Sequence, residues 1–253
     1  MTAKIALITG ASRGLGRNMA LHLAERGVGI IGTYRTGQKE ADALQKEIEE
    51  GGRGKAVMCL LDVADTTSFA QFGETVSAAL QERFGRTRFD YLVNNAGIGL
   101  HAPLTDTTEA QFDAMVDAHL RAPLFLTQQL LPLLEDGGSI LNVSSGFVRF
   151  TLPGYGVYAA VKAAVDVLTR YMAVELGERR IRVNSIAPGA VETDFMGGAV
   201  RDNEGVNAYV AQGIALGRVG QPDDIGRAVA AILSADLAWA NGTSFDVSGG
   251  QLL

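Results

Sequence analysis

Hydrophobic residues fall into short runs that alternate with longer amphipathic stretches along nearly the whole chain. The short runs predict buried strands, and the longer stretches repeat apolar positions with helical spacing. The predicted strands are Lys4–Thr9, Val28–Tyr34, Lys55–Leu60, Phe89–Val93, Ser139–Val143, Ile181–Ile186 and Thr243–Val247. The predicted helices are Gly14–Arg26, Gln38–Glu50, Thr67–Phe84, Thr108–Leu134, Tyr155–Gly177 and Pro222–Ser234.

This alternation predicts an α/β fold. Apolar strands separated by helices form a parallel sheet that helices cover on both faces. We therefore predict one doubly wound, Rossmann-type domain over residues 1–253, with a seven-stranded parallel sheet and right-handed crossovers. The rhythm breaks between Ile186 and Pro222, where glycines and a weakly helical stretch replace a strand. An insertion of this kind is typical of a substrate lid, which we expect at about residues 190–216.

Composition and charge exclude several classes of function for this chain. The 253 residues are 47% hydrophobic and 20% charged, which is typical of a globular domain. The formal net charge of −6 argues against a nucleic-acid partner or an anionic membrane surface. The one cysteine, Cys59, lies in an apolar run, so we expect a buried thiol and a cytoplasmic protein. No apolar run is long enough for a bilayer, the first strand starts too early for a signal peptide, and no metal site is expected.

A glycine-rich segment, Thr9–Gly16, follows the first predicted strand. Its glycines at positions 10, 14 and 16 allow a tight turn, and the next helix directs its N-terminus at that turn. The spacing GxxxGxG is not the common GxGxxG, and a turn that only needs small residues would look similar. The position at the first strand-to-helix junction of a parallel sheet favours a dinucleotide site.

The residues at the end of the second predicted strand indicate which dinucleotide the site binds. An NAD site usually has an acidic residue there for the ribose 2′-hydroxyl. This chain instead has Arg35 and Thr36, with Arg13 in the glycine-rich segment. Guanidinium groups suit a 2′-phosphate, so we predict NADP(H) rather than NAD(H). The alternative is that Arg35 is an ordinary solvated loop residue.

Tyr158 and Lys162 stand four residues apart in a predicted helix, so their side chains share one face. A phenol normally titrates near ~10, and a neighbouring cation lowers that pKa. Such a pair can give a proton to a carbonyl oxygen or take one from an alcohol.

Four motifs together resemble the short-chain dehydrogenase/reductase family, along the whole chain. They are Thr9–Gly16, Asn94–Gly97, the set Ser145, Tyr158 and Lys162, and Pro188-Gly189 with Thr193. Members that are 3-oxoacyl carrier-protein reductases are similar overall. The resemblance implies an oxidoreductase that uses NADP(H) to reduce a carbonyl to an alcohol, or the reverse.

The resemblance also implies roles for single residues. Tyr158 would be the general acid/base, Lys162 would lower the phenol pKa and hold the nicotinamide ribose, and Ser145 would bind the substrate oxygen. Ser144 would support the backbone. The implied cofactor contacts are Gly10, Ser12, Arg13, Gly14, Leu15, Gly16, Arg35, Thr36, Asp62, Val63, Asn94, Ala96, Gly97, Tyr158, Lys162, Pro188, Gly189, Val191 and Thr193.

The chain departs from the family at His119, where most members have a catalytic asparagine. Pro123, four residues later, has no N–H for the carbonyl of His119, so we predict a kink that frees this carbonyl. We hypothesise that the carbonyl holds a relay water beside Lys162. The His119 side chain could instead titrate near neutral pH and join the relay, or only fill the space of the asparagine.

The substrate would lie between the Ser145–Tyr158 loop and the expected lid. Mostly apolar candidates there favour a small, uncharged, hydrophobic carbonyl or alcohol, although Arg149 could bind an anion. Phe147, Leu152, Tyr155, Phe195 and Met196 are the principal candidates, with Leu100, Val148 and Phe150 beside them.

Three further expectations remain open from the sequence. A 3-oxoacyl carrier-protein reductase is the leading alternative, since Arg179 and Arg180 could contact an acidic carrier protein or simply complement a helix end. A non-catalytic NADP(H)-binding regulator is a second alternative, which the complete Ser145, Tyr158 and Lys162 set argues against. The resemblance also implies a homo-oligomer, either a tetramer or a dimer.

Overall fold

The computed structural model describes residues 3–253 and contains one sheet of seven parallel strands. The strand order is β3-β2-β1-β4-β5-β6-β7, which confirms the predicted doubly wound sheet. The strands are β1 (Ile5–Ile8), β2 (Gly29–Tyr34), β3 (Ala56–Leu60), β4 (Phe89–Asn94), β5 (Leu134–Val143), β6 (Arg182–Pro188) and β7 (Ser244–Val247).

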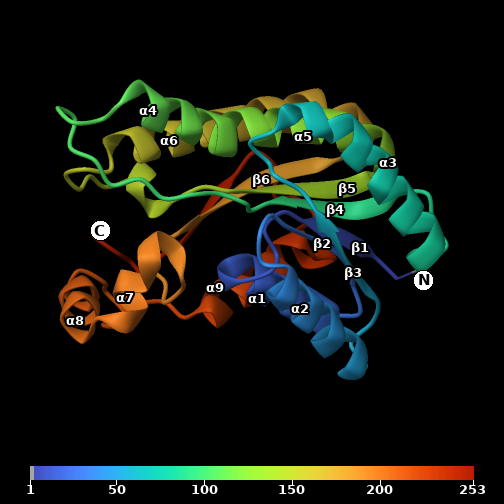
Figure 1. Cartoon of the computed structure of the whole chain (residues 1–253), viewed down its shortest axis with the longest axis horizontal. Helices are drawn as coiled ribbons and strands as arrows, with labels where there is room; N and C mark the ends of the chain where they lie inside the picture. Colours follow the sequence, from blue (N-terminus) through green and yellow to red (C-terminus); the bar gives the residue numbers. More distant parts are fainter. Residues whose placement is uncertain (1–2) are drawn as a thin grey trace.

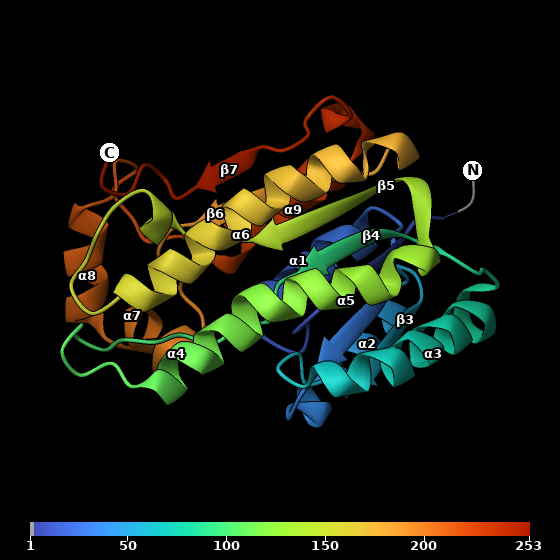
Figure 2. The ribbon, with the colours of Figure 1, turned by 90° about the horizontal axis from the view of Figure 1, so that it is seen from above.

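Helices cover both faces of this sheet (Figure 1). On one face lie α3 (Phe69–Ala79), α4 (Glu109–Val116), α5 (Ala122–Leu130) and α6 (Gly156–Glu175), which Figure 2 shows from above. On the other face lie α1 (Gly14–Glu25), α2 (Gln38–Glu50) and α9 (Pro222–Leu233). No helix among residues 3–253 has both the length and the apolar content needed to cross a membrane.

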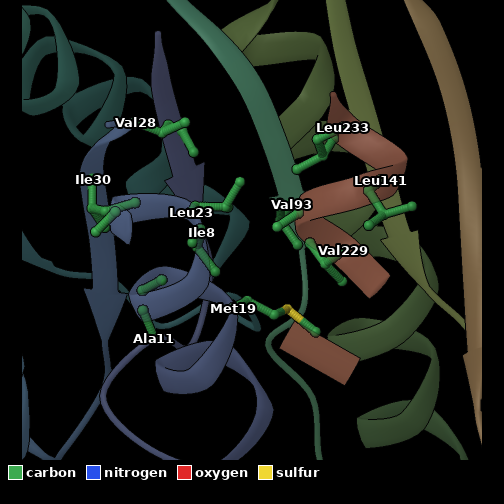
Figure 3. Packing of buried hydrophobic residues seen from close by; sticks show 14 of the residues in the cluster. Ile8, Ala11, Met19, Leu23, Val28, Ile30, Val93, Leu141, Val229 and Leu233 are labelled. Carbon is green, nitrogen blue, oxygen red and sulfur yellow. The ribbon is translucent and has the colours of Figure 1, made fainter. Parts of the chain in front are cut away.

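Two hydrophobic clusters hold these layers together. In the first, Ile8, Val93 and Leu141 from neighbouring strands pack toward Met19 of α1 and Val229 of α9 (Figure 3). The second cluster lies on the opposite face, against α3, α5 and α6. Burial on both faces explains why β1, which reads Ile-Ala-Leu-Ile, is continuously apolar rather than alternating.

The long helix predicted over Thr108–Leu134 differs from the structure. A π-helical turn, η3 (Asp117–Arg121), separates α4 from α5, and the N–H of Ala122 bonds to the carbonyl of Asp117, five residues back. Pro123 lacks an N–H, so the regular bonding pattern is interrupted here, which is a common cause of such turns.

The helix predicted to end at Leu134 ends earlier, because β5 already begins there. β5 begins at Leu134, five residues before the predicted Ser139, and its register against β4 shifts between Phe89 and Tyr91. Gly137 has φ +75°, a conformation that favours glycine. Glycines are typical of loops, so the sequence of this segment predicts a loop rather than a strand.

The segment after β6 forms short helices, α7 (Ala199–Asp202) and α8 (Glu204–Gln212). They lie beyond the carboxyl ends of the strands, beside the C-terminus of the chain (Figures 1 and 2). The predicted insertion therefore stands where a doubly wound fold binds its ligands.

Candidate active site

A cleft of about 850 Å³ opens at the carboxyl ends of the strands. It extends from the glycine-rich turn after β1 to the insertion after β6. Ligands of doubly wound sheets bind at this edge because loops and helix N-termini converge there.

The glycine-rich turn is shaped for close approach of a ligand to the backbone. Gly10 has φ +67°, and a Cβ on Gly16 would lie 2.2 Å from the carbonyl oxygen of Gly10. Asn95 fixes the turn by donating from Nδ2 to the carbonyls of Thr9 (2.8 Å) and Gly10 (3.1 Å). No side chain caps the N-terminus of α1 at Arg13, so its first N–H groups are available to an anion.

Two arginines border this end of the cleft. Arg13 and Arg35 are exposed and both line the cleft. Among residues 3–253 neither forms an ion pair with a carboxylate, whereas Arg17, one turn into α1, pairs with Glu47. The two guanidinium groups therefore provide an anion site beside the expected adenosine ribose.

Ser145, Tyr158 and Lys162 are buried at the other end of the cleft. Ser145 follows β5, and its Oγ accepts a hydrogen bond from the N–H of Phe147 (3.3 Å). The Nζ of Lys162 donates to the carbonyl of Val143 (2.7 Å) and lies 5.7 Å above the centroid of the Tyr158 ring. The set therefore joins the end of β5 to the first two turns of α6.

Burial shifts the pKa values of Tyr158 and Lys162 in opposite directions. Burial raises the pKa of Tyr158 to about 12, and the nearby hydroxyl of Ser145 acts in the opposite direction. Burial lowers the pKa of Lys162 to about 7, which Asp166 partly opposes. In this arrangement the Nζ of Lys162 lies over the ring face and bonds to a carbonyl, and burial dominates the phenol pKa. The lowering of that pKa by Lys162 stays a prediction.

His119 is buried in the π turn and also lines the cleft. Burial, and secondly the charge of Lys162, lower its pKa to about 3. The imidazole is therefore neutral at physiological pH, and the alternative that it titrates near neutrality is wrong. The freed carbonyl of His119 stays a prediction.

Aromatic side chains surround the phenol of Tyr158. Phe147 and Tyr155 stack with centroids 4.5 Å apart, and Phe195 of the insertion lies 6.0 Å from the Tyr158 ring. The cleft includes all five principal substrate candidates and also Phe150, but neither Leu100 nor Val148. Leu100 packs instead in the small cluster around Tyr158.

Comparisons with known proteins agree with this geometry. Residues 10–251 match a family model described as Enoyl-(Acyl carrier protein) reductase. The short-chain dehydrogenase/reductase FrzI of Cladobotryum sp. is 37% identical over 98% of this chain and 95% of its own length. The chain belongs to the short-chain dehydrogenase/reductase family.

Two other similar proteins are reductases. The hydroxynaphthalene reductase-like protein Arp2 of Metarhizium brunneum is 35% identical over 100% of this chain and 96% of its own. The crystal structure of the angucycline C-6 ketoreductase LanV with bound NADP superposes with a TM-score of 0.93, at 36% identity, covering 98% of this chain and 95% of that one.

Within this short-chain dehydrogenase/reductase, the cleft collects all but one of the residues expected to contact the cofactor. The exception is Asn94, whose Nδ2 donates to Asn142 (2.8 Å) and Thr127 (3.2 Å) inside the structure. Two residues that the sequence reasoning missed also line the cleft, Asn95 and Gln251. Asn95 lies in the quoted Asn94–Gly97 motif, whereas Gln251 reaches the cleft from the far end of the chain without any local signal.

Arg149 and Arg179, two of the three arginines considered as binding groups, are engaged within the fold. Arg149 donates to the carboxylate of Asp246 (2.8 Å) and to the carbonyls of Gln251 (2.5 Å) and Leu252 (3.0 Å). It ties the loop after β5 to the C-terminal segment, so it is not a free anion site. Arg179 donates to the carboxylate of Asp136 (2.7 Å) and to the carbonyls of Leu131 (2.9 Å) and Leu134 (2.6 Å), so most of its donors are already used within the fold.

Proposed function

We propose that this chain is an NADP(H)-dependent ketoreductase that reduces a ketone carried on a flat, hydrophobic ring system. The observation that carries the proposal is one continuous cleft. At one end are Arg13 and Arg35, which pair with no carboxylate among residues 3–253, and at the other are the buried Ser145, Tyr158 and Lys162. The same residues would catalyse alcohol oxidation in the opposite direction.

The cofactor assignment is supported by the fit of the cleft. The open N-terminus of α1 suits a pyrophosphate, and Arg13 with Arg35 suits a ribose 2′-phosphate. LanV, at 36% identity, has bound NADP. When bound, the nicotinamide would supply the hydride, and the chain supplies the remaining chemistry.

Reduction would need a proton and a stabilised oxygen, and the buried hydroxyls can provide both. Ser145 and Tyr158 would each donate a hydrogen bond to the carbonyl oxygen, where negative charge develops. The raised pKa of Tyr158 keeps the phenol protonated at neutral pH, so it is ready to donate that proton. Lys162 would hold the cofactor ribose through its remaining ammonium donors.

The substrate class is inferred from the aromatic end of the cleft. The Phe147 ring is edge-on to Tyr158 (6.1 Å) and stacked on Tyr155, while Phe195 approaches Tyr158 from the insertion. Flat aromatic rings gain favourable contacts on such surfaces beyond simple burial. The name of the Metarhizium relative refers to hydroxynaphthalene, a flat fused-ring compound.

A substrate panel tests the proposal. We expect NADPH oxidation with 1-tetralone, a fused-ring ketone, at a kcat/KM about tenfold or more above that for cyclohexanone. Phe147→Leu should reduce this preference, because it removes a stacking face. Equal efficiency with both ketones would refute the ring preference, and no turnover with any ketone would refute the ketoreductase itself.

The two alternatives predict different results in the same assay. A 3-oxoacyl carrier-protein reductase would turn over an acetoacetyl thioester faster than 1-tetralone. A non-catalytic regulator would bind NADPH and reduce nothing. The engagement of Arg179 in the fold and the complete catalytic set favour the ketoreductase.

We also propose that two copies associate through the outer face of α4–α6. These helices lie next to one another (Figure 2). Large apolar side chains remain exposed on them, which is typical of an interface. They are Phe112, Leu124, Phe125, Val167, Tyr171 and Val174. Sedimentation should give at least a dimer, and Val174→Lys should shift the protein toward the monomer; a wild-type monomer would contradict the proposal.

A further inference from the structure

The C-terminal segment, Ser248–Leu252, is bonded to three separate walls of the cleft. The first wall is the end of the insertion, just after α8, which the segment meets through three backbone hydrogen bonds. The N–H groups of Ala215, Leu216 and Leu252 donate to the carbonyls of Gly250 (3.2 Å), Gly249 (3.0 Å) and Gly213 (2.8 Å), respectively. The segment and the end of the insertion are therefore held together as a short antiparallel pair.

Gln251 joins the segment to the second wall, the loop after β6. Its side chain is buried and lines the cleft, and its Oε1 accepts a hydrogen bond from the N–H of Ala190 (2.8 Å). A Cβ on Gly189 would lie 2.9 Å from the Cα of Ser248, so glycine allows the loop and the segment to pack this closely.

Arg149 joins the segment to the third wall, the loop after β5. Its guanidinium donates to the carbonyls of Gln251 (2.5 Å) and Leu252 (3.0 Å) and to the carboxylate of Asp246 (2.8 Å). A rigid, planar guanidinium can hold several acceptors at once, which a single ammonium cannot do with the same geometry. One side chain thus completes the connection between the three walls.

The backbone of Leu252 is held in a strained conformation by these contacts. It has φ +48°, in the left-handed region that is unfavourable for a leucine. Its N–H bonds to Gly213 and its carbonyl bonds to Arg149, so both neighbours fix the same residue. Strained residues persist only where their surroundings hold them, and they are concentrated at functional sites.

Two aromatic rings connect Arg149 to the phenol of Tyr158. The guanidinium lies 5.5 Å from the centroid of Phe150, which packs edge-on against Phe147 (5.3 Å). Phe147 in turn is edge-on to Tyr158 (6.1 Å), and Phe195 approaches the same phenol from the insertion (6.0 Å). The loop that carries Phe147 and the insertion that carries Phe195 are therefore tied to one segment.

We propose that Arg149 is a positioning residue that, through the C-terminal segment, fixes the spacing between Phe147 and Phe195 and so sets the preference for flat ring ketones. Arg149 itself does not line the cleft, so it acts only through the walls that it joins. The inference rests on the proposed function in naming flat ring ketones as the substrates.

Arg149→Gln tests the proposal by steady-state kinetics. The side chain is 33% exposed and its acceptors can bond to water, so this variant should fold with little loss of stability. We expect KM for 1-tetralone to rise roughly five- to tenfold with kcat within about twofold, because looser walls lose binding rather than chemistry. Cyclohexanone, a single ring that needs fewer wall contacts, should keep its kcat/KM within about twofold.

Arg83→Gln is the matched control. Arg83 also bonds to a carboxylate, that of Glu49, and to a carbonyl, that of Ala56 (3.4 Å), but it does not line the cleft. Its kinetics should match the wild type. Equal losses with both ketones in Arg149→Gln would show a merely structural role, and an unchanged KM for 1-tetralone would show no role, so either result would overturn the proposal.

A double variant tests whether the effect travels through the segment. Gln251→Leu breaks the bond to Ala190, and it should also raise KM for 1-tetralone. In Arg149→Gln/Gln251→Leu the rise should be smaller than the product of the two single effects, because both residues act through one segment. Effects that multiply would mean that the residues act independently, which contradicts the proposal.

Amide hydrogen exchange tests the connection without any substrate. In Arg149→Gln, exchange at residues 189–191 and 213–216 should be about threefold faster or more, while exchange in α2 stays as in the wild type. Unchanged exchange in these two stretches would refute the positioning role. If exchange becomes faster but the wild type does not prefer 1-tetralone, the proposed substrate class is wrong and the connection from Arg149 to the insertion stands.

Discussion

At the residue scale, burial sets the chemistry of the site. Tyr158 and Lys162 could be predicted from their spacing, and Ser145 from the family resemblance. Their protonation could not, because it depends on how deeply other segments bury them. Burial raises the pKa of Tyr158 to about 12 and lowers the pKa of Lys162 to about 7. At neutral pH the phenol therefore keeps its proton, whereas the lysine is close to its own pKa.

Removing the phenol should separate chemistry from binding. Tyr158→Phe keeps the ring but lacks the proton donor, so we expect kcat for ketone reduction to fall roughly 100- to 10,000-fold. NADPH affinity, measured by fluorescence, should stay within about threefold, since the ring and Lys162 remain. Tyr209→Phe is the matched control, because this tyrosine is 77% exposed on α8 and does not line the cleft. Retention of activity in Tyr158→Phe would exclude the phenol as the donor.

Lys162 should lower the stability of the cofactor-free protein. Its folded pKa is about 7 against 10.5 as the reference, so the desolvation cost is full below pH 7 and fades as the pH rises toward 10.5. Lys162→Met should therefore be more stable than wild type at pH 6.5, by roughly 1–3 kcal/mol after loss of the bond to Val143.

This gain should shrink at pH 9.5 in urea unfolding. Lys46→Met, at an exposed position of α2, should show no comparable change with pH. A Lys162→Met gain that did not depend on pH would show that the lysine is not desolvated. The stability cost of Lys162 is a sign that this residue serves function rather than folding.

At the element scale, the sequence predicts strands and most helices closely, because their apolar periods are long and regular. Prediction from the sequence fails where one residue changes the pattern of backbone hydrogen bonds. The π turn at Asp117–Arg121 lies inside a stretch with an unbroken helical pattern, and Pro123 is the only local sign of it. The early start of β5 was hidden by its glycines, since the pairing that makes them a strand comes from β4.

Pro123→Ala tests whether that turn serves the site. Alanine restores an N–H that can bond to the carbonyl of His119 and favours a regular α-helical turn. We expect a stable protein whose kcat for ketone reduction falls roughly tenfold or more, since His119 and the phenol it packs against would shift. Pro132→Ala, in the short helical turn before β5, is the matched control. Unchanged kcat in Pro123→Ala would count against both the freed carbonyl and the turn.

At the scale of the whole molecule, the C-terminal segment reaches a cleft that is built by residues far from it in the sequence. Gln251 accepts from the N–H of Ala190 (2.8 Å), and Arg149 holds the C-terminal segment against the catalytic loop. These contacts join residues about 60 to 100 positions apart. No local pattern indicates them, so Gln251 was missed and Arg149 was given a different role from the sequence.

The charge distribution of the whole chain also bears on the cofactor. A net charge of −6 repels a phosphorylated dinucleotide at long range, so recognition must come from local groups. Arg13 and Arg35 are the arginines of the cleft, and neither is neutralised by a carboxylate in the described part of the chain. Their effect should therefore be large for NADPH and small for NADH.

Replacing both arginines should reverse the cofactor preference. In Arg13→Ser/Arg35→Ser, kcat/KM with NADPH should fall roughly 100-fold, since each charged hydrogen bond contributes about 1.5–3 kcal/mol. The value with NADH should change less than about threefold, because NADH has no 2′-phosphate. Added salt should weaken NADPH binding in wild type more than in the double variant. Arg227→Ser, at an exposed position of α9, should behave as wild type, and equal losses with both cofactors would mean that the arginines do not recognise the 2′-phosphate.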